Sequence, residues 1–129
     1  MTITGISHAG LTVTDLDRSM KWYADVLGWA EVYAGEAEGD RFALGFIGPV
    51  GVALRQAGAG TADEFTADRT GLDHLAFAVG SRADLETWEK KFSEHGVPYT
   101  PTVDEDYGHV LNFRDPDNIA LEVFARRDT

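Results

Sequence analysis

Hydrophobic residues alternate with small or polar residues in the run 6–13 near the start of the chain. Ala9, Leu11 and Val13 fall on one face of a predicted strand, and His8 falls on the other. Successive side chains of a strand point to opposite faces. The pattern therefore predicts a strand with one apolar face for a core and an opposite face that carries His8.

Two later runs have the same alternation. In residues 72–79 the apolar positions leave His74 on the opposite face, and in residues 118–124 they leave Glu122 there. Three predicted strands thus each present one group that is able to bind a metal ion. Two histidines and one carboxylate with open positions are the usual ligands of a non-haem Fe(II) site, and they suit other divalent ions too.

Two stretches have apolar residues at helical spacing. Thr14 is placed to cap the start of the first helix and Gly28 to end it, and Ser81 and Gly96 do the same for the second. An acid follows each capping residue three positions later, as in a capping box. The apolar stripes consist of Leu16, Met20, Tyr23 and Leu27 in the first helix, and of Leu85, Trp88 and Phe92 in the second.

The two halves repeat one order of elements. Three strand-like runs follow each helix, at about 29–34, 40–47 and 50–56 in the first half and about 98–103, 108–114 and 118–125 in the second. We predict an α+β fold of two paired βαβββ units, whose curved eight-stranded mixed sheet surrounds a cavity and has its helices outside. The single domain 1–129 would comprise unit one (1–57), a linker (58–71) and unit two (72–129).

Composition narrows the classes of partner. The chain has 11 basic and 22 acidic residues, a net charge of −11, which disfavours nucleic acid and anionic membranes and favours solubility. It has no apolar run of the roughly 18 residues that cross a bilayer. The absence of cysteine excludes disulfides and thiolate chemistry and fits a cytoplasmic protein.

Further polar residues are candidates for contact with a small-molecule substrate. Arg55, Arg114 and Arg41 are positioned to face the cavity and bind an anionic group, although ion pairing in a very acidic protein is the alternative. Tyr107 and Asn112 are candidates to contact substrate, and Trp29, Tyr33 and Phe124 are candidates for pocket walls. Asn112 shares the parity of Arg114, so we expect its side chain on the cavity face.

At this point the chain resembles the vicinal oxygen chelate superfamily. This group includes glyoxalase I, extradiol dioxygenases, methylmalonyl-CoA epimerase, fosfomycin-resistance enzymes and bleomycin-binding proteins. The matching segments are 6–13, 20–29, 71–79 and 113–124. In that superfamily the metal ligands come from the first and last strands of each unit, and the resemblance assigns three of them to His8, His74 and Glu122.

The fourth ligand position of the superfamily lies on the last strand of the first unit, within 51–56. Ala53 occupies it here, and Gln56 would reach it only if the apolar face of the strand were reversed. The missing ligand argues against glyoxalase I and the epimerases. Extradiol dioxygenases use His, His and Glu, but they also carry a cavity tyrosine where this chain has Asn112.

The resemblance implies a metal-dependent enzyme that acts on a small substrate with vicinal oxygens. We favour an Fe(II) dioxygenase, with Mn(II), Ni(II) or Zn(II) as other possible ions. One alternative is a metal-free protein of the bleomycin-resistance type that binds an antibiotic or metabolite. Another is a glyoxalase-like lyase or isomerase. The superfamily also leads us to expect a homodimer, in which the two units are often exchanged between chains.

Overall fold

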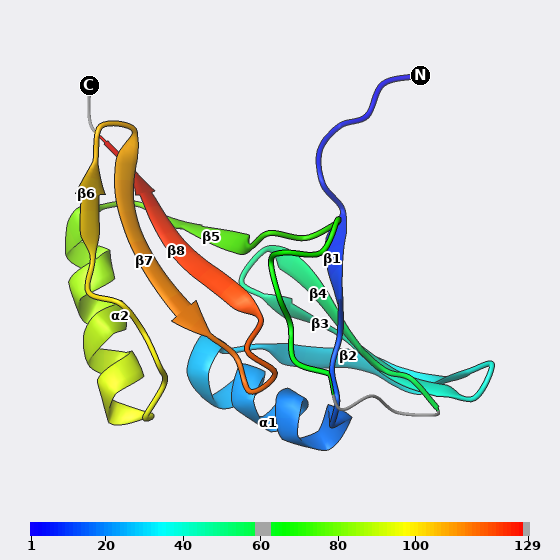
Figure 1. Ribbon diagram of the computed structural model, residues 1–129. Coiled ribbons are helices and arrows are strands. Elements are labelled where there is room, and N and C mark those ends of the chain that lie inside the picture. Colours follow the sequence, from blue (N-terminus) through cyan, green and yellow to red (C-terminus); the bar gives the residue numbers. More distant parts are fainter. Residues whose placement is uncertain (59–62, 128–129) are drawn as a thin grey trace. The chain divides into compact units, whose positions relative to one another are not determined.

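The computed structural model describes residues 1–58 and 63–127. The chain forms two compact units, Met1–Asp63 and Glu64–Thr129. Each unit contains a strand, a helix and three further strands in that order (Figure 1), so the predicted α+β fold with two βαβββ units is confirmed. The division between the units falls within the predicted linker 58–71, of which residues 59–62 lie outside the described residues.

The first unit contains one four-stranded sheet and one helix. Its strands have the order β1-β4-β3-β2; β1 is parallel to β4, and the other neighbours are antiparallel. The elements are β1 (His8–Thr12), α1 (Leu16–Leu27), β2 (Ala30–Ala37), β3 (Asp40–Ile47) and β4 (Val50–Gln56).

The second unit repeats this topology. Its strands have the order β5-β8-β7-β6, and β5 is parallel to β8. The elements are β5 (Leu75–Val79), α2 (Arg82–Glu94), β6 (Val103–Glu105), β7 (Gly108–Arg114) and β8 (Ala120–Arg126). The eight predicted strands are therefore present as two four-stranded mixed sheets.

The predicted strand at 98–103 is largely irregular. Only an isolated bridge between Tyr99 and Phe113 precedes β6, which starts at Val103. Pro98 and Pro101 have no backbone N–H to donate to a ladder, so a regular strand cannot form across them.

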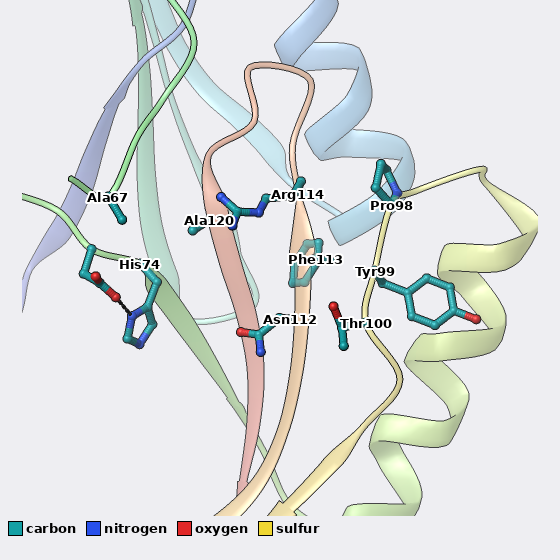
Figure 2. A pocket seen from close by; sticks show the side chains of 10 residues that line it. Ala67, His74, Pro98, Tyr99, Thr100, Asn112, Phe113, Arg114 and Ala120 are labelled. Atoms are coloured by element: carbon teal, nitrogen blue, oxygen red, sulfur yellow. Dashed lines mark hydrogen bonds and ion pairs between the residues drawn. The ribbon is translucent and has the colours of Figure 1, made fainter. Parts of the chain in front are cut away.

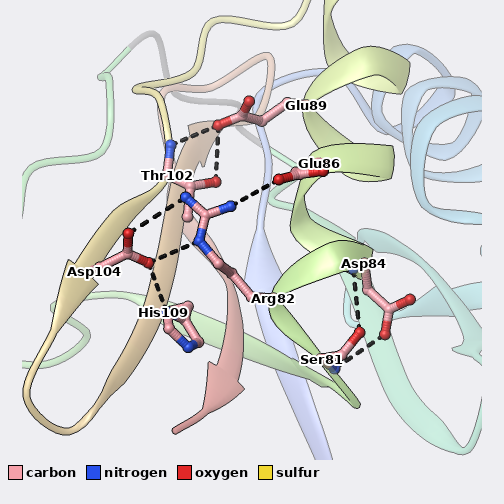
Figure 3. Close-up of polar contacts among 8 residues, drawn as sticks. All are labelled: Ser81, Arg82, Asp84, Glu86, Glu89, Thr102, Asp104 and His109. Atoms are coloured by element: carbon pink, nitrogen blue, oxygen red, sulfur yellow. Dashed lines mark hydrogen bonds and ion pairs between the residues drawn. The ribbon is translucent and has the colours of Figure 1, made fainter.

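The start of α1 differs by one residue from the prediction. Asp15, not Thr14, is the N-cap, and its side chain accepts a hydrogen bond from the Arg18 backbone N–H. The Thr14 hydroxyl instead accepts from the Arg18 guanidinium. At α2 the predicted capping box of Ser81 and Asp84 is present (Figure 3).

Each helix ends at a glycine in the left-handed region. Gly28 has a φ of 72° and Gly96 a φ of 65°. A side chain at these positions would be strained, whereas glycine adopts the conformation freely and lets the chain turn into the next strand. Both predicted helix ends are therefore correct.

Each unit buries the helix-facing side of its own sheet. In the first unit α1 packs on β3 and β4, and in the second α2 packs on β7 and β8. The buried residues of the first unit include Tyr23, Val26, Val52 and Leu54, and those of the second include Leu85, Phe92, Leu111, Phe113 and Leu121. The opposite side carries His8 in the first unit, and Asn112 and Glu122 in the second.

Two residues that were predicted to face the cavity lie on the helix side. Trp29, predicted as a pocket wall, is 5% exposed, and its indole N–H donates to the Val52 carbonyl at 2.9 Å. A Cβ at Gly45 would overlap the Trp29 ring, so the glycine gives the ring its place. Arg41 also lies on this side, where its ion pair with Asp17 of α1 agrees with the ion-pairing alternative. No helix within 1–58 or 63–127 is both long and apolar enough to traverse a bilayer.

Gln56 provides a test of this arrangement. Its side-chain oxygen accepts the Leu16 backbone N–H at 2.7 Å, at the first residue of α1. We expect Gln56→Ala to lower the free energy of unfolding by about 1–2 kcal/mol, because a part-buried donor loses its partner. Urea unfolding measures this, and Lys90→Ala on the exposed face of α2 should stay within about 0.5 kcal/mol of the unmodified protein. An equal effect of the two substitutions would contradict the prediction.

Candidate functional site

Glu122 and His74 lie close together in the second unit. The His74 Nε2 and a Glu122 carboxylate oxygen are 3.5 Å apart. Glu122 is in the middle of β8, in register with Ala76 of β5 and Asn112 of β7. Its side chain is 12% exposed, because neighbouring strands flank it on both sides. His74 was predicted within a strand, but it precedes β5 by one residue.

The separation of these two groups suits a metal ion. Adjacent ligands of an ion that binds each at about 2.1 Å lie roughly 3 Å apart. His74 Nε2 and Glu122 need only a small adjustment to reach that separation. A neutral imidazole and a carboxylate are also donors that first-row divalent ions accept. The pair therefore fits two positions of one ion.

Burial raises the pKa of Glu122 above its usual value, because the carboxylate is partly removed from water. The nearby His74 acts against this rise, and the negative charge of Asp73 adds to it. Without an ion, the ionised form of Glu122 is therefore less favoured than it would be in water. A bound cation would offset that cost.

Asp73 fixes the orientation of the His74 ring. The Asp73 carboxylate lies 2.7 Å from His74 Nδ1. Figure 2 marks the contact at His74 with a dashed line. A proton on Nδ1 that is donated to this carboxylate leaves Nε2 with its lone pair, on the side where Glu122 lies. A carboxylate behind a ligating histidine also makes the ring a stronger donor to a metal.

His8 has a similar arrangement in the first unit, with a neutral partner. The Ser7 hydroxyl is 3.0 Å from His8 Nδ1. His8 is the first residue of β1, not a central one, and it is in register with Gly51 of β4. A Cβ at Gly51 would lie only 3.0 Å from the His8 Cβ, so glycine gives the histidine room. In both units the residue before the histidine therefore binds Nδ1.

The last strand of the first unit supplies no further ligand on this face. Ala53 lies between Gly10 of β1 and Leu44 of β3 and has no donor atom in its side chain. Gln56 has the opposite parity and bonds to the start of α1. The disfavoured assignment of Gln56 as a ligand is therefore inconsistent with the structure.

Within the described residues, no group of three or more His, Asp or Glu side chains is placed to hold a metal ion. Of the three predicted ligands, His74 and Glu122 lie in the second unit and His8 lies in the first. The complete set of three ligands stays a prediction.

Asn112 borders a polar hollow in the second unit. The hollow has a volume of about 480 Å³, and its lining includes His74, Thr100, Asn112 and Arg114 (Figure 2). The Arg114 guanidinium donates to the Asn118 carbonyl at 3.1 Å and so is held at one end. Asn112 lies directly opposite Glu122 across the β7–β8 pair. Its amide is therefore placed to contact a molecule that reaches Glu122.

Arg55 and Tyr107 have different surroundings. Arg55 forms an ion pair with Asp40 at 2.5 Å and donates to the Thr12 hydroxyl. The Gly58 backbone N–H and the Arg55 guanidinium lower the pKa of Asp40. Binding of substrate by Arg55 would therefore compete with an existing ion pair. Tyr107 is 68% exposed, and its ring stacks on that of Phe124.

A second polar cluster lies on the helix side of this unit (Figure 3). Arg82 of α2 donates to Asp104, which also bonds to His109 Nδ1 at 2.6 Å. Both contacts lower the pKa of Asp104, and the hydrogen bond from Arg82 has the larger effect. His109 therefore ties β7 to the helix layer and lies away from the face of Glu122.

The sequence patterns did not identify Ser7, Asp73 and Thr100 as residues of the candidate site. The signal for the first two was available, since each directly precedes a candidate histidine and has an oxygen in its side chain. Thr100 gave no such signal. It lies in the irregular segment beside β7, where its backbone N–H donates to the Asn112 carbonyl.

A model of the Glyoxalase/Bleomycin resistance protein/Dioxygenase superfamily matches residues 5–123. The chain belongs to this superfamily. The match covers both units and both candidate histidines as well as Glu122. The resemblance drawn from the four sequence segments is therefore confirmed.

Individual members of the Glyoxalase/Bleomycin resistance protein/Dioxygenase superfamily match nearly the whole chain. The fosfomycin resistance protein FosX of Mesorhizobium japonicum is 31% identical, over 94% of this chain and 85% of its own. The crystal structure of a domain of the same superfamily from Frankia sp. EAN1pec is 41% identical and has a TM-score of 0.93, over 98% of this chain and 95% of its own.

One solved member of the superfamily contains a metal ion and a small molecule. It is a variant of FosX from Listeria monocytogenes, complexed with Mn(II) and 1S,2S-dihydroxypropylphosphonic acid. It is 20% identical, covers 98% of this chain and 93% of its own, and has a TM-score of 0.74. At that identity the likeness to this chain shows the fold alone.

We predict that Asp73 affects metal affinity through His74. Asp73→Ala should weaken binding of Mn(II) about 10- to 100-fold, the usual effect of removing the partner of a ligating histidine. Ser7→Ala should weaken it less, because a hydroxyl carries no charge. Isothermal titration calorimetry measures both. Asp106→Asn removes an exposed acid of the same unit and controls for the change in net charge. If it weakens Mn(II) binding as much as Asp73→Ala does, the prediction is wrong.

The raised pKa of Glu122 predicts a pH-dependent cost in the metal-free protein. A carboxyl whose pKa is higher in the folded state destabilises the fold as pH rises through that pKa, and it has no such effect below the unfolded value. Glu122→Gln should therefore increase the free energy of unfolding at pH 7, and the gain should vanish below about pH 4. Urea unfolding with chelator at both pH values tests this. A loss of stability at pH 7 would contradict it.

Proposed function

We propose that this protein is a divalent-metal-dependent enzyme that binds its ion with His8, His74 and Glu122. The substrate would be a small molecule that presents two neighbouring oxygens to the ion. The observation that supports this most directly is the pair of His74 Nε2 and Glu122, at 3.5 Å with Nδ1 of the histidine bound to Asp73. The relatives in the superfamily support the same class of enzyme.

Charge suggests what the site would accept. A divalent ion with two neutral histidines and one carboxylate keeps a net charge of +1, which favours an anionic chelating substrate. When bound, the ion would supply Lewis acidity to the substrate oxygens. The residues of the chain have simpler tasks: Asp73 orients His74, and Asn112 offers an amide beside Glu122 to hold a substrate oxygen.

The comparisons favour a reaction that does not consume O₂ as the leading candidate. The Mesorhizobium relative is named a fosfomycin resistance protein, and the Listeria structure pairs Mn(II) with a vicinal diol. An Fe(II) dioxygenase is the second candidate, because the ligand set would be two histidines and one glutamate with Ala53 at the fourth position.

We also propose that the protein is a cytoplasmic homodimer.

The first test is the metal content of the purified protein. We expect about one divalent ion per chain, and loss of that ion in His8→Ala and in Glu122→Ala, because each removes one of the proposed ligands. Elemental analysis by mass spectrometry measures the content. His95→Ala is the matched control, since His95 caps α2 and bonds to the Lys91 carbonyl.

Addition of Mn(II), Fe(II), Ni(II) or Zn(II) to metal-free protein completes this test. If none of them binds, the proposal is wrong and a metal-free binding protein is the better account. If Fe(II) alone supports consumption of O₂ with an added catechol, the dioxygenase replaces the leading candidate. Hydration of fosfomycin with Mn(II) and without O₂ would support the leading one.

A further inference from the structure

A second hollow borders Glu122 in the second unit. It has a volume of about 480 Å³ and lies on the sheet face shared by β5 and β8. His74 and Glu122 line it together with Phe124, Tyr107 and Arg126. Asn112 and Arg114 do not line it, so it differs from the polar hollow described above. A molecule bound at Glu122 therefore has aromatic surface available in this direction.

Phe124 forms a flat surface in this hollow. A Cβ at Gly108 of the neighbouring β7 would overlap the Phe124 ring, so the glycine lets the ring lie directly on the strand. The ring of Tyr107 is nearly parallel to that of Phe124, at an interplanar angle of 7° and a centroid distance of 6.1 Å. Two nearly parallel rings form an aromatic surface that favours contact with a planar group.

Arg126 adds a positive charge beside this surface. Among residues 1–58 and 63–127, no carboxylate lies within ion-pairing distance of its guanidinium, although the chain has a net charge of −11. By contrast, Arg41, Arg55 and Arg82 are each paired with an aspartate. Arg126 is therefore available to bind an anionic group of a ligand.

Strand geometry places these groups in line. Glu122, Phe124 and Arg126 occupy alternate positions of β8 and so share one face. Residues two apart in a strand are separated by about 7 Å. That spacing suits one ring over Phe124 with substituents that extend towards Glu122 on one side and Arg126 on the other.

A separate hollow in the first unit borders His8 and has apolar walls. A hollow of about 200 Å³ there is lined by His8 together with Val32, Leu44 and Phe46. The exposed fractions of these three apolar residues are 63%, 38% and 46%.

We propose that the substrate carries an aromatic or similarly planar ring with an anionic substituent, bound over Phe124 with its charge at Arg126. This inference rests on the proposed function for the position of the reacting oxygens. Recognition of the ring depends only on the hollow itself, so the two are tested separately.

The test compares three probes of similar size on the full-length, metal-free protein. Benzoate is flat and anionic, cyclohexanecarboxylate is anionic but not flat, and benzamide is flat but neutral. We expect benzoate to bind about three- to tenfold more tightly than either of the others, as measured by NMR titration. Phe124→Leu should abolish the preference for benzoate over cyclohexanecarboxylate. Arg126→Gln should abolish the preference for benzoate over benzamide.

Arg127→Gln is the matched control, because Arg127 is also exposed but does not line the hollow. It should keep both preferences. Arg126 is exposed, so its substitution tests the inference even if Phe124→Leu unfolds the protein. Equal affinity for benzoate and cyclohexanecarboxylate in the unmodified protein would overturn the inference, as would retention of the benzamide discrimination in Arg126→Gln.

Metal content of the same preparations separates this inference from the proposed function. Protein that binds an ion through His8 and Glu122 but does not prefer benzoate would refute the aromatic site alone. Protein that prefers benzoate but binds no ion would refute the proposed enzyme alone and leave a binding protein for aromatic anions.

Discussion

The packing of one helix against one face of each four-stranded sheet is the constraint on which the rest of the structure depends. It requires apolar residues at alternate positions of β4, β7 and β8, such as Leu54, Leu111 and Leu121, which are at most 1% exposed. Because the side-chain period of a strand is two, the same requirement fixes which residues point away from the helix. Glu122 faces away from α2 because Leu121 and Val123 must face it.

This constraint explains which features were predictable from sequence. The two βαβββ units, the ends of both helices at glycine and the face of Glu122 all follow from periodicity and local backbone chemistry. Gln56 was correctly excluded from the cavity face by parity alone, and the structure adds the reason for its presence, a hydrogen bond to the start of α1. Here the sequence pattern and the packing agree.

Departures from the periodic pattern have physical causes that the pattern itself does not contain. Arg41 and Trp29 lie on the helix side because the ends of long side chains find partners there, Asp17 for the guanidinium and the Val52 carbonyl for the indole. His74 is just outside β5 because the ladder with β8 begins at Leu75. The set of His8, His74 and Glu122 stays a prediction, since three ligands from distant segments require a tertiary arrangement.

The two histidines have different surroundings, although the two units share one topology. Each ring is bound at Nδ1 by the preceding residue, which leaves Nε2 of both free to act as a ligand. The partner is a hydroxyl at His8 and a carboxylate at His74, so the electron density on the two Nε2 atoms differs. His74 also has Glu122 within 3.5 Å, whereas His8 borders apolar residues. The second unit therefore carries two of the three proposed ligands, and the hollow beside His8 in the first unit is lined by apolar side chains.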